Sequence, residues 1–346
     1  MTREFPLLVL LSVVALTSVT CHSPTGPSSG ADTTSHAFTW QTFTFGGNAG
    51  SCVLSDVAII SDTDIWAVGA VYLDSADGNP DPSAYNVVHW NGSSWQLGRI
   101  YFSTVCGQPD STPYPVAAIF ALSGADVWIA GAGEVVRFNG QSYGTPVCVE
   151  SPTSFAVNKL WGNSDNSMYA VGYGGNIFRY VGGNWNKLST GTTTDILDIW
   201  GVGGTAYCAV TNAFDTAEEK RILKITNGNN VDSIEWVGRE VGSVWTPDGT
   251  HLYTAGDGVF ENDGSGWKEM NTGASIFTSS VRGNANNDFV VVGGFGFIAH
   301  WNGADFNIFP APMDAIYTRV AMKGDMVVAV GMAGSTEQAV ITVGRR

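Results

Sequence analysis

A segment of about forty residues recurs along this chain of 346 residues, and this repeat limits the possible folds more than any other feature. The clearest copies contain an apolar stretch that starts at an acidic residue and ends in glycine, as in Asp64–Gly69 (DIWAVG) and Asp126–Gly131 (DVWIAG). A second apolar stretch follows, and an Asn-Gly or Gly-Gly pair then leads to an aromatic residue. Seven copies align on the middle of the first stretch, at Trp66, Trp128, Tyr169, Tyr207, Tyr253, Val290 and Val327.

Each copy has the composition of short strands joined by tight turns. Glycine is abundant, with 43 residues, and charged residues make up only 14% of the chain. The Asn-Gly and Gly-Gly pairs are typical of two-residue hairpin turns. A period near forty with four strands per copy is typical of propeller blades, which bury their faces against one another. The sequence therefore predicts an all-β, seven-bladed β-propeller with four antiparallel strands per blade.

The two ends of the repeat region complement each other. The seventh copy stops after its third strand, at Thr342–Arg346, and lacks a fourth. The segment Phe38–Phe43 (FTWQTF) has the pattern of a fourth strand, with Trp40 at the aromatic position. We therefore expect this N-terminal strand to lie beside the strand near Ile341 and to close the ring, which removes the exposed sheet edges.

The start of the chain has the pattern of an export signal. Arg3 precedes the apolar run Leu7–Leu16, which has the length of a signal-peptide core and is too short to span a bilayer. The Ser-Val-Thr-Cys21 that follows resembles the lipobox of bacterial lipoproteins, which implies lipidation of Cys21. Ser18 and Thr20 depart from the residues that this family prefers, so ordinary cleavage and free secretion stay open as an alternative.

Composition then divides the chain into three parts. Residues 1–21 are expected to be the signal peptide ending in the lipobox cysteine, and 22–37 a flexible tether rich in Ser, Thr, Gly and Pro. Residues 38–346 are expected to form the propeller. We expect an exported lipoprotein of the cell envelope, at the outer membrane or surface, in preference to a freely secreted protein, with membrane contact only through the lipid.

The charge balance disfavours one class of partner. The chain has 16 basic and 31 acidic residues and a net charge of −15. Proteins that bind nucleic acid need a cationic surface to displace counterions from phosphate, so no nucleic-acid partner is expected. Attachment to anionic lipid by surface charge alone is disfavoured for the same reason.

The repeats resemble the Asp-Val-Trp-Ala-Val-Gly propellers that are common in exported bacterial proteins. In strand order they are also similar to the photosystem assembly-factor and Asp-box propellers, in which a Gly-x-Ile strand leads through a glycine-rich turn to Trp. No copy contains Ser-x-Asp-x-Gly-x-Thr-Trp, so the resemblance does not extend to sialidase chemistry. It implies a binding or assembly scaffold without a defined ligand.

Polar residues that recur at equivalent positions of the repeat are interpreted as structural. His89 and His300 occupy a position where other copies have Arg or Lys. The acidic residues before the first apolar stretch are expected to accept backbone N–H bonds in a turn, and they are Asp64, Asp126, Asp288 and Asp325. We therefore predict no catalytic residues. An enzyme would need carboxylates in distinct environments that converge in one pocket.

One insertion, 70–86 in the first copy, is the only candidate metal site. Its oxygen-bearing residues are Asp74, Asp77, Asn79 and Asp81. Their spacing of two or three residues around a turn suits Ca²⁺, although the segment does not match an EF-hand loop. A solvated acidic loop without metal is the favoured interpretation, and no other cofactor is expected.

The cysteines other than Cys21 fall into two groups. Cys52, Cys106 and Cys148 lie in the connections that lead into the first strand of a blade, and export permits a disulfide. We favour the pair Cys106–Cys148 over Cys52–Cys106. Cys208 lies within a strand and is expected to be a buried free thiol.

These features favour a non-catalytic, monomeric scaffold that binds a protein or a glycan at the cell envelope. The blade-to-blade connections and the second-to-third-strand connections share one face of a propeller, and this face is the expected binding surface. The alternative is a glycan-active hydrolase or lyase with its site at the central channel. Trp161, Trp200 and Trp245 end the first strands of their copies near this channel, although core packing is the favoured interpretation.

Overall fold

A computed structural model describes residues 32–47, 50–75, 77–150, 156–164, 167–211, 219–311 and 314–346. The chain divides into Met1–Asp32 and a compact unit, Thr33–Arg346, and the description below concerns the second unit. No helix of the described residues is long and apolar enough to cross a membrane.

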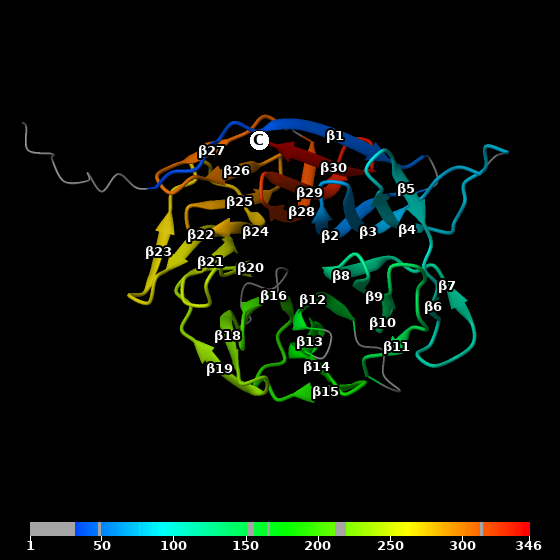
Figure 1. Ribbon diagram of the computed structural model, residues 1–346, viewed down its shortest axis with the longest axis horizontal. Helices are drawn as coiled ribbons and strands as arrows, with labels where there is room; N and C mark the ends of the chain where they lie inside the picture. Colours follow the sequence, from blue (N-terminus) through cyan, green and yellow to red (C-terminus); the bar gives the residue numbers. More distant parts are fainter. Residues whose placement is uncertain are drawn as a thin grey trace, which may run out of the picture. The chain divides into compact units, whose positions relative to one another are not determined.

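Seven four-stranded antiparallel sheets surround a central channel, as the repeat predicted (Figure 1). Blade one contains β2 (Val53–Ser61), β3 (Asp64–Val71), β4 (Tyr85–Trp90) and β5 (Trp95–Gly98), and blade two β8 (Val116–Ser123), β9 (Asp126–Gly131), β10 (Glu134–Phe138) and β11 (Val147–Cys148). Blade three contains β12 (Val157–Ser164), β13 (Ser167–Gly172), β14 (Ile177–Val181) and β15 (Asn184–Leu188), and blade four β16 (Ile196–Val202), β17 (Thr205–Val210), β18 (Arg221–Thr226) and β19 (Asn230–Ile234). Blade five contains β20 (Val241–Trp245), β21 (Leu252–Gly256), β22 (Gly258–Asn262) and β23 (Trp267–Met270), and blade six β24 (Thr278–Ala285), β25 (Asp288–Gly293), β26 (Ile298–Trp301) and β27 (Phe306–Ile308). Blade seven contains β28 (Ala315–Lys323), β29 (Met326–Ala333), β30 (Gln338–Arg345) and β1 (Thr39–Phe45), and the ribbon β6 (Phe102–Ser103) and β7 (Ser111–Thr112) lies between blades one and two.

The N-terminal strand closes the ring as predicted. β1 pairs antiparallel with β30, with Phe43 opposite Ile341 and Trp40 opposite Gly344. The indole of Trp40 lies over Gly344, where a Cβ atom would come within 2.6 Å of the ring. Blade seven is therefore assembled from both ends of the repeat region, and its two outermost strands lie side by side in Figure 1.

Because the strands of each blade alternate in direction, the propeller has two distinct faces. We call the face with the blade-to-blade connections and the second-to-third-strand connections the linker face; it includes Phe277 and Phe295. The opposite face carries the turns between first and second and between third and fourth strands. We call it the hairpin face; it includes Asn287 and Gly324.

Every innermost strand contains a β-bulge near its start. The bulge brings the backbone of this strand close to the end of the second strand. A Cβ atom at Gly69 or Gly331 would overlap the carbonyl oxygen of Val53 or Ile316, respectively. Steric contact therefore explains why most copies of the apolar stretch end in glycine.

The recurring acidic residues bind side chains, which corrects the prediction of backbone turn contacts. Asp64 accepts hydrogen bonds from Trp66 Nε1 at 2.7 Å and from His89 Nε2 at 2.8 Å. Asp126 does the same with Trp128 Nε1 and Arg137 Nε, at 2.8 and 2.6 Å. The cause is the register: the Trp lies directly opposite the His or Arg, and the Asp lies two residues earlier on the same face of its strand. These contacts link the second and third strands of each of these two blades.

The residues just before β1 are held by blade six. His36 Nδ1 lies 2.8 Å from Nδ1 of His300, and His300 Nε2 lies 2.8 Å from Asp288. Arg346 donates two hydrogen bonds to the same carboxylate, at 2.8 and 2.6 Å. Thr34 N donates to the backbone of Asn302. The described end of the predicted tether thus contacts the propeller on its hairpin face, and the compact unit begins at Thr33.

This cluster makes stability sensitive to mild acid. Burial lowers the pKa of His300, against the opposing effect of Asp288. An unfolded histidine has a pKa of about 6.5, so below this pH the unfolded chain binds more protons than the folded one, and the free energy of unfolding falls. We expect urea denaturation to show this decline between pH 7 and 5, and His300→Gln to remove most of it. His251→Gln, at an exposed histidine, should keep the decline; equal profiles for the two variants would contradict the assignment.

Candidate functional site at the central channel

Charged side chains close the middle of the channel. One residue of each innermost strand lies directly after the bulge, and these seven residues are Asp56, Ala118, Lys159, Asp198, Ser243, Ser280 and Arg319. Four of them are charged, and Arg282 of blade six adds a fifth charge two residues further along its strand. The carboxylate of Asp56 accepts a hydrogen bond from Lys159 Nζ at 2.5 Å and another from the backbone N–H of Ile119 at 2.9 Å. Asp56 is 1% exposed and Lys159 4%. This ion pair connects blades one, two and three without contact with bulk water.

Asp198 connects the next three blades in the same way. Its carboxylate accepts hydrogen bonds from Arg282 at 2.7 and 3.0 Å, from Ser243 Oγ at 2.6 Å and from the Val244 N–H at 3.1 Å. Burial alone would raise the pKa of Asp198, but Arg282 and Arg319 outweigh it and hold the pKa below its usual value. Asp198 is therefore a carboxylate at neutral pH.

Arg319 of blade seven reaches across the channel to blade four. Its guanidinium donates to the carbonyl oxygen of Leu197 at 2.8 Å and to that of Thr318 at 3.0 Å. No carboxylate within the described ranges lies at ion-pair distance from it. The channel thus holds three cations, Lys159, Arg282 and Arg319, against two carboxylates.

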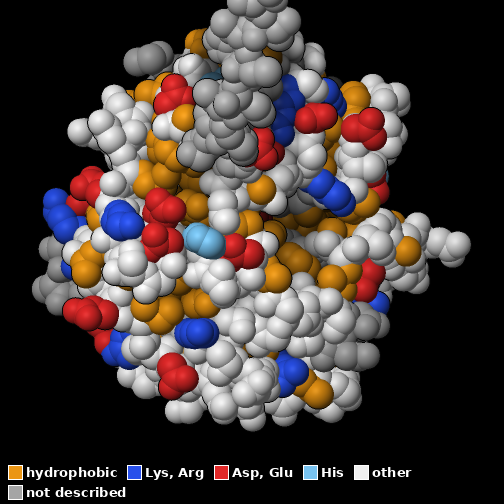
Figure 2. Space-filling model, turned by 60° about the vertical axis from the view of Figure 1, so that its left-hand side comes forward, with side chains coloured by type: hydrophobic (Ala, Val, Ile, Leu, Met, Phe, Trp, Pro, Cys, Tyr) orange, Lys and Arg blue, Asp and Glu red, His pale blue; other side chains and the backbone are white. Residues whose placement is uncertain are grey.

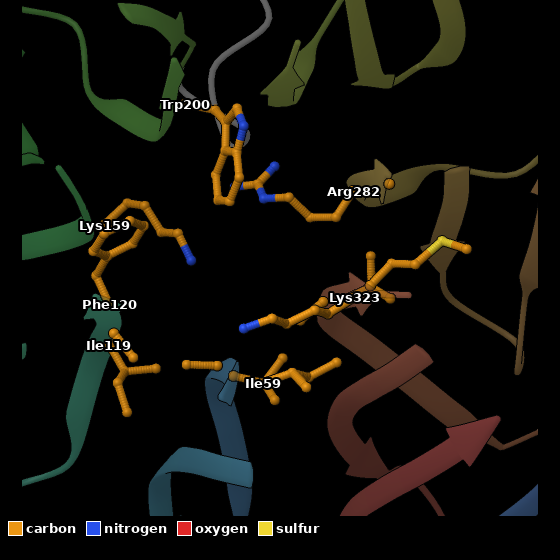
Figure 3. Close-up of a pocket in the computed structure, with 14 residues that line it drawn as sticks. Ile59, Ile119, Phe120, Lys159, Trp200, Arg282 and Lys323 are labelled. Atoms are coloured by element: carbon orange, nitrogen blue, oxygen red, sulfur yellow. The ribbon is translucent and has the colours of Figure 1, made fainter. Parts of the chain in front are cut away.

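A cavity of about 160 Å³ lies on the hairpin side of these charges (Figure 3). Its walls come from the second halves of the innermost strands and include Ile59, Ile119 and Phe120. The amino groups of Lys159 and Lys323 point into it, and the guanidinium of Arg282 lies 4.5 Å from the ring centre of Trp200. None of the residues that line the cavity is acidic.

A second hollow, of about 310 Å³, opens on the linker face. Its wall is formed by the bulge residues of all seven blades, which are Ser55, Ala117, Asn158, Leu197, Gly242, Ser279 and Thr318. Phe277 and Arg319 complete it. In the view of Figure 2, acidic and basic side chains are interspersed over the surface, with apolar side chains between them.

Exposed apolar side chains concentrate on the linker face. Of twelve large apolar residues described as exposed, seven lie there: Tyr101, Val105, Tyr173, Val237, Phe277, Phe295 and Ile316. Phe295 is 73% exposed, and its backbone is left-handed, with φ of 56°. Phe295 directly precedes Gly296, whose N–H donates to the carbonyl of Ala315, so Phe295 and Ile316 lie on adjoining backbone.

The structure does not gather the oxygen ligands predicted for calcium. Asp81 accepts a hydrogen bond from Arg99 at 2.6 Å, and Asp77 accepts one from the Asn79 amide at 2.7 Å. Asp74 pairs with Pro80 in an isolated bridge. Among the described residues, the carboxylate oxygens of Asp74, Asp77 and Asp81 do not all lie within 4.8 Å of one another. The calcium hypothesis stays a prediction; an unchanged melting temperature on addition of calcium would count against it.

The cysteines lie as follows. Cys106 and Cys148, the pair favoured from the sequence, are joined by a disulfide. Glu134 lies beside this disulfide, and its Oε2 accepts a hydrogen bond from the Ser103 N–H at 2.8 Å. The three side chains are close enough together to bind a metal ion, but the two sulfur atoms are bonded to each other. Cys52 and Cys208 are buried free thiols, and burial raises the pKa of Cys208. Cys21 lies outside the described residues.

Of the three tryptophans expected near the channel, only Trp200 lines the cavity. Trp161 and Trp245 are buried in the clusters between blades. Sequence reasoning missed the charged level of the channel. Polar residues inside otherwise apolar strands were the available signal. The residue type at this position changes among Asp, Ala, Lys, Ser and Arg from copy to copy, so no repeat pattern marks it.

No protein-family model and no curated protein matches the sequence. Solved structures do match the fold. The structure described as YCF48 bound to D1 peptide has a TM-score of 0.64 and 14% identity, over 89% of this chain and 95% of that one. The chain is a β-propeller. Two further propellers have a similar fold. The WD40 repeats of RRP9 have a TM-score of 0.65 and 10% identity, over 88% of this chain and 97% of that one. YCF48 from Cyanidioschyzon merolae has a TM-score of 0.62 and 13% identity, over 88% of this chain and 98% of that one. At these identities the likeness concerns the fold alone.

Proposed function

We propose that this chain is an exported, non-catalytic scaffold that binds a protein partner through its linker face. The observation that carries the proposal is Phe295. A bulky residue in left-handed backbone costs roughly 1–2 kcal/mol, and this one gains nothing from burial because it is 73% exposed. Phe277 and Ile316 add exposed apolar surface nearby. Exposed apolar patches mark protein interaction surfaces, and aromatic residues are enriched in such interfaces.

The charges in the channel support a non-catalytic function. Asp56 and Asp198 are each bound to a buried cation, and Asp198 is ionised, so it has no proton to donate. A glycan-active hydrolase would need one carboxylic acid that is protonated and one that is not. The likeness to a propeller with a bound peptide is consistent with a protein partner.

The setting at the cell envelope is part of the proposal and rests on the N-terminal sequence. Arg3, the apolar run Leu7–Leu16 and Cys21 support export followed by lipidation, with free secretion as the alternative. We expect the purified native protein to begin at a lipid-modified Cys21 in mass spectrometry. An unmodified N-terminus elsewhere would refute the anchor and leave the binding proposal untouched.

Site-specific photo-cross-linking tests the binding face. A benzophenone amino acid at position 295 of the full-length protein, produced in its native cells, should cross-link one protein partner. The same probe at Val181, an exposed apolar residue on the hairpin face, should not. Cross-links of equal yield from both positions, or none from position 295, would contradict the proposal. A cross-link to a glycan would show that the ligand of this face is a glycan and not a protein.

Phe295→Gly separates binding from folding. Glycine adopts positive φ without strain, so we expect the free energy of unfolding to be unchanged or to rise by about 1 kcal/mol. Binding of the partner found by cross-linking should weaken at least tenfold, as measured by titration calorimetry. A variant that is less stable and binds normally would show that Phe295 serves the fold.

A further inference from the structure

Two lysines direct their amino groups into the cavity on the hairpin side of the channel (Figure 3). Lys159 Nζ donates to Asp56, and Lys323 Nζ donates to the carbonyl oxygen of Ile60 at 2.8 Å. A lysine ammonium has three N–H donors. Among the described residues each amine has this single hydrogen-bond partner, so both keep donors that can reach a group inside the cavity.

Of the three cations that line the cavity, Lys323 is the one without a carboxylate at ion-pair distance among the described residues. Lys159, Arg282 and Lys323 line it, and the carboxylates of Asp56 and Asp198 lie behind the first two. A negative charge placed between the two amines would pair with Lys323. In a protein with a net charge of −15, a lining with three cations and no acid is a feature that needs an explanation.

The remaining walls are apolar and suit a flat ring. Ile59, Ile119 and Phe120 line one side, and Trp200 faces them from blade four. The cavity has about 160 Å³. An apolar protein cavity of roughly 150 Å³ is known to accept one benzene molecule, so the space matches one six-membered ring.

We propose that this cavity binds a small organic monoanion, in which a carboxylate is attached to an apolar ring. The carboxylate lies between the amines of Lys159 and Lys323, and the ring lies against Trp200, Phe120 and Ile119. The site is on the face opposite to Phe295 and is independent of the proposed protein partner.

Calorimetric titration of the full-length protein with three probes tests the site. Benzoate should bind, benzamide, which has the same shape without the charge, should bind at least tenfold more weakly, and inorganic phosphate should bind more weakly than benzoate. Equal affinities for benzoate and benzamide would overturn the role of the lysines. Tighter binding of phosphate would overturn the role of the ring.

Three variants locate the binding. Lys323→Met removes one amine at an exposed position and should weaken benzoate at least tenfold without changing benzamide. Lys268→Met, at an exposed lysine of β23 outside the channel, is the matched control and should change neither. Ala121→Leu fills the cavity from its wall and should abolish both. Benzoate binding that survives Lys323→Met or Ala121→Leu would overturn the proposal.

Discussion

Replacing Asp198 by alanine is expected to lower the free energy of unfolding by about 3–5 kcal/mol, the usual cost of removing one partner of a buried ion pair. The loss leaves the guanidinium of Arg282 buried without its counter-charge and takes an acceptor from Ser243 and from the Val244 N–H. A domain of ordinary stability has only about 5–15 kcal/mol in total, so the variant should be near the limit of folding. Urea denaturation followed by tryptophan fluorescence measures the change.

Two further variants separate this effect from a general loss of charge. Asp263→Ala removes an exposed carboxylate that is paired with Lys268, and it should change the free energy of unfolding far less than Asp198→Ala does. The double variant Asp198→Ala with Arg282→Met removes both charges and should recover a large part of the lost stability. If Asp198→Ala alone lowered the free energy of unfolding by less than about 1 kcal/mol, this would contradict the view that the Asp198–Arg282 pair holds blades four to six together.

Replacing Trp40 by alanine is expected to cost about 3 kcal/mol and to loosen the closure of the ring. The indole packs against Phe309, with ring centres 4.9 Å apart, and covers Gly344 of β30. β1 is the outermost strand of its sheet and pairs only with β30, at seven positions. It can therefore separate from the sheet without disturbing the other strands. Hydrogen exchange in the variant should therefore show β1 exchanging faster than the rest of the sheet.

Trp185→Ala is the matched comparison for this closure. Trp185 holds the equivalent aromatic position in blade three, where β15 is continuous with the chain on both sides. A similar loss of packing energy is expected there, but without selective exchange of one strand. Equal exchange patterns in the two variants would show that the closure is no weaker than any other strand pair.

The blade count and the closure could be predicted because both depend on patterns that repeat. Turn glycines, alternating apolar stretches and an aromatic residue at or near the fourth strand recur from copy to copy, so an error in one copy is corrected by the others. The orphan Phe38–Phe43 segment then has only one vacant place to occupy. In the structure it spans Thr39–Phe45, a shift of one or two residues that the pattern does not resolve.

The charged level of the channel could not be predicted because it depends on differences between copies. Lys159 reaches Asp56 across 103 positions of sequence, and Arg282 reaches Asp198 across 84. Each pair forms only when the innermost strands of separate blades have come together around the channel. The turn acids were assigned the wrong partners for a related reason: only the register between the second and third strands brings Trp66 and His89 to Asp64.

The contacts of the residues before β1 separate the two faces of the propeller. Thr34 contacts Asn287 and Asp288 at the hairpin turn of blade six, on the side opposite to Phe295. The described residues that precede β1 therefore leave the aromatic surface around Phe295 uncovered, and a partner can reach it without displacing them.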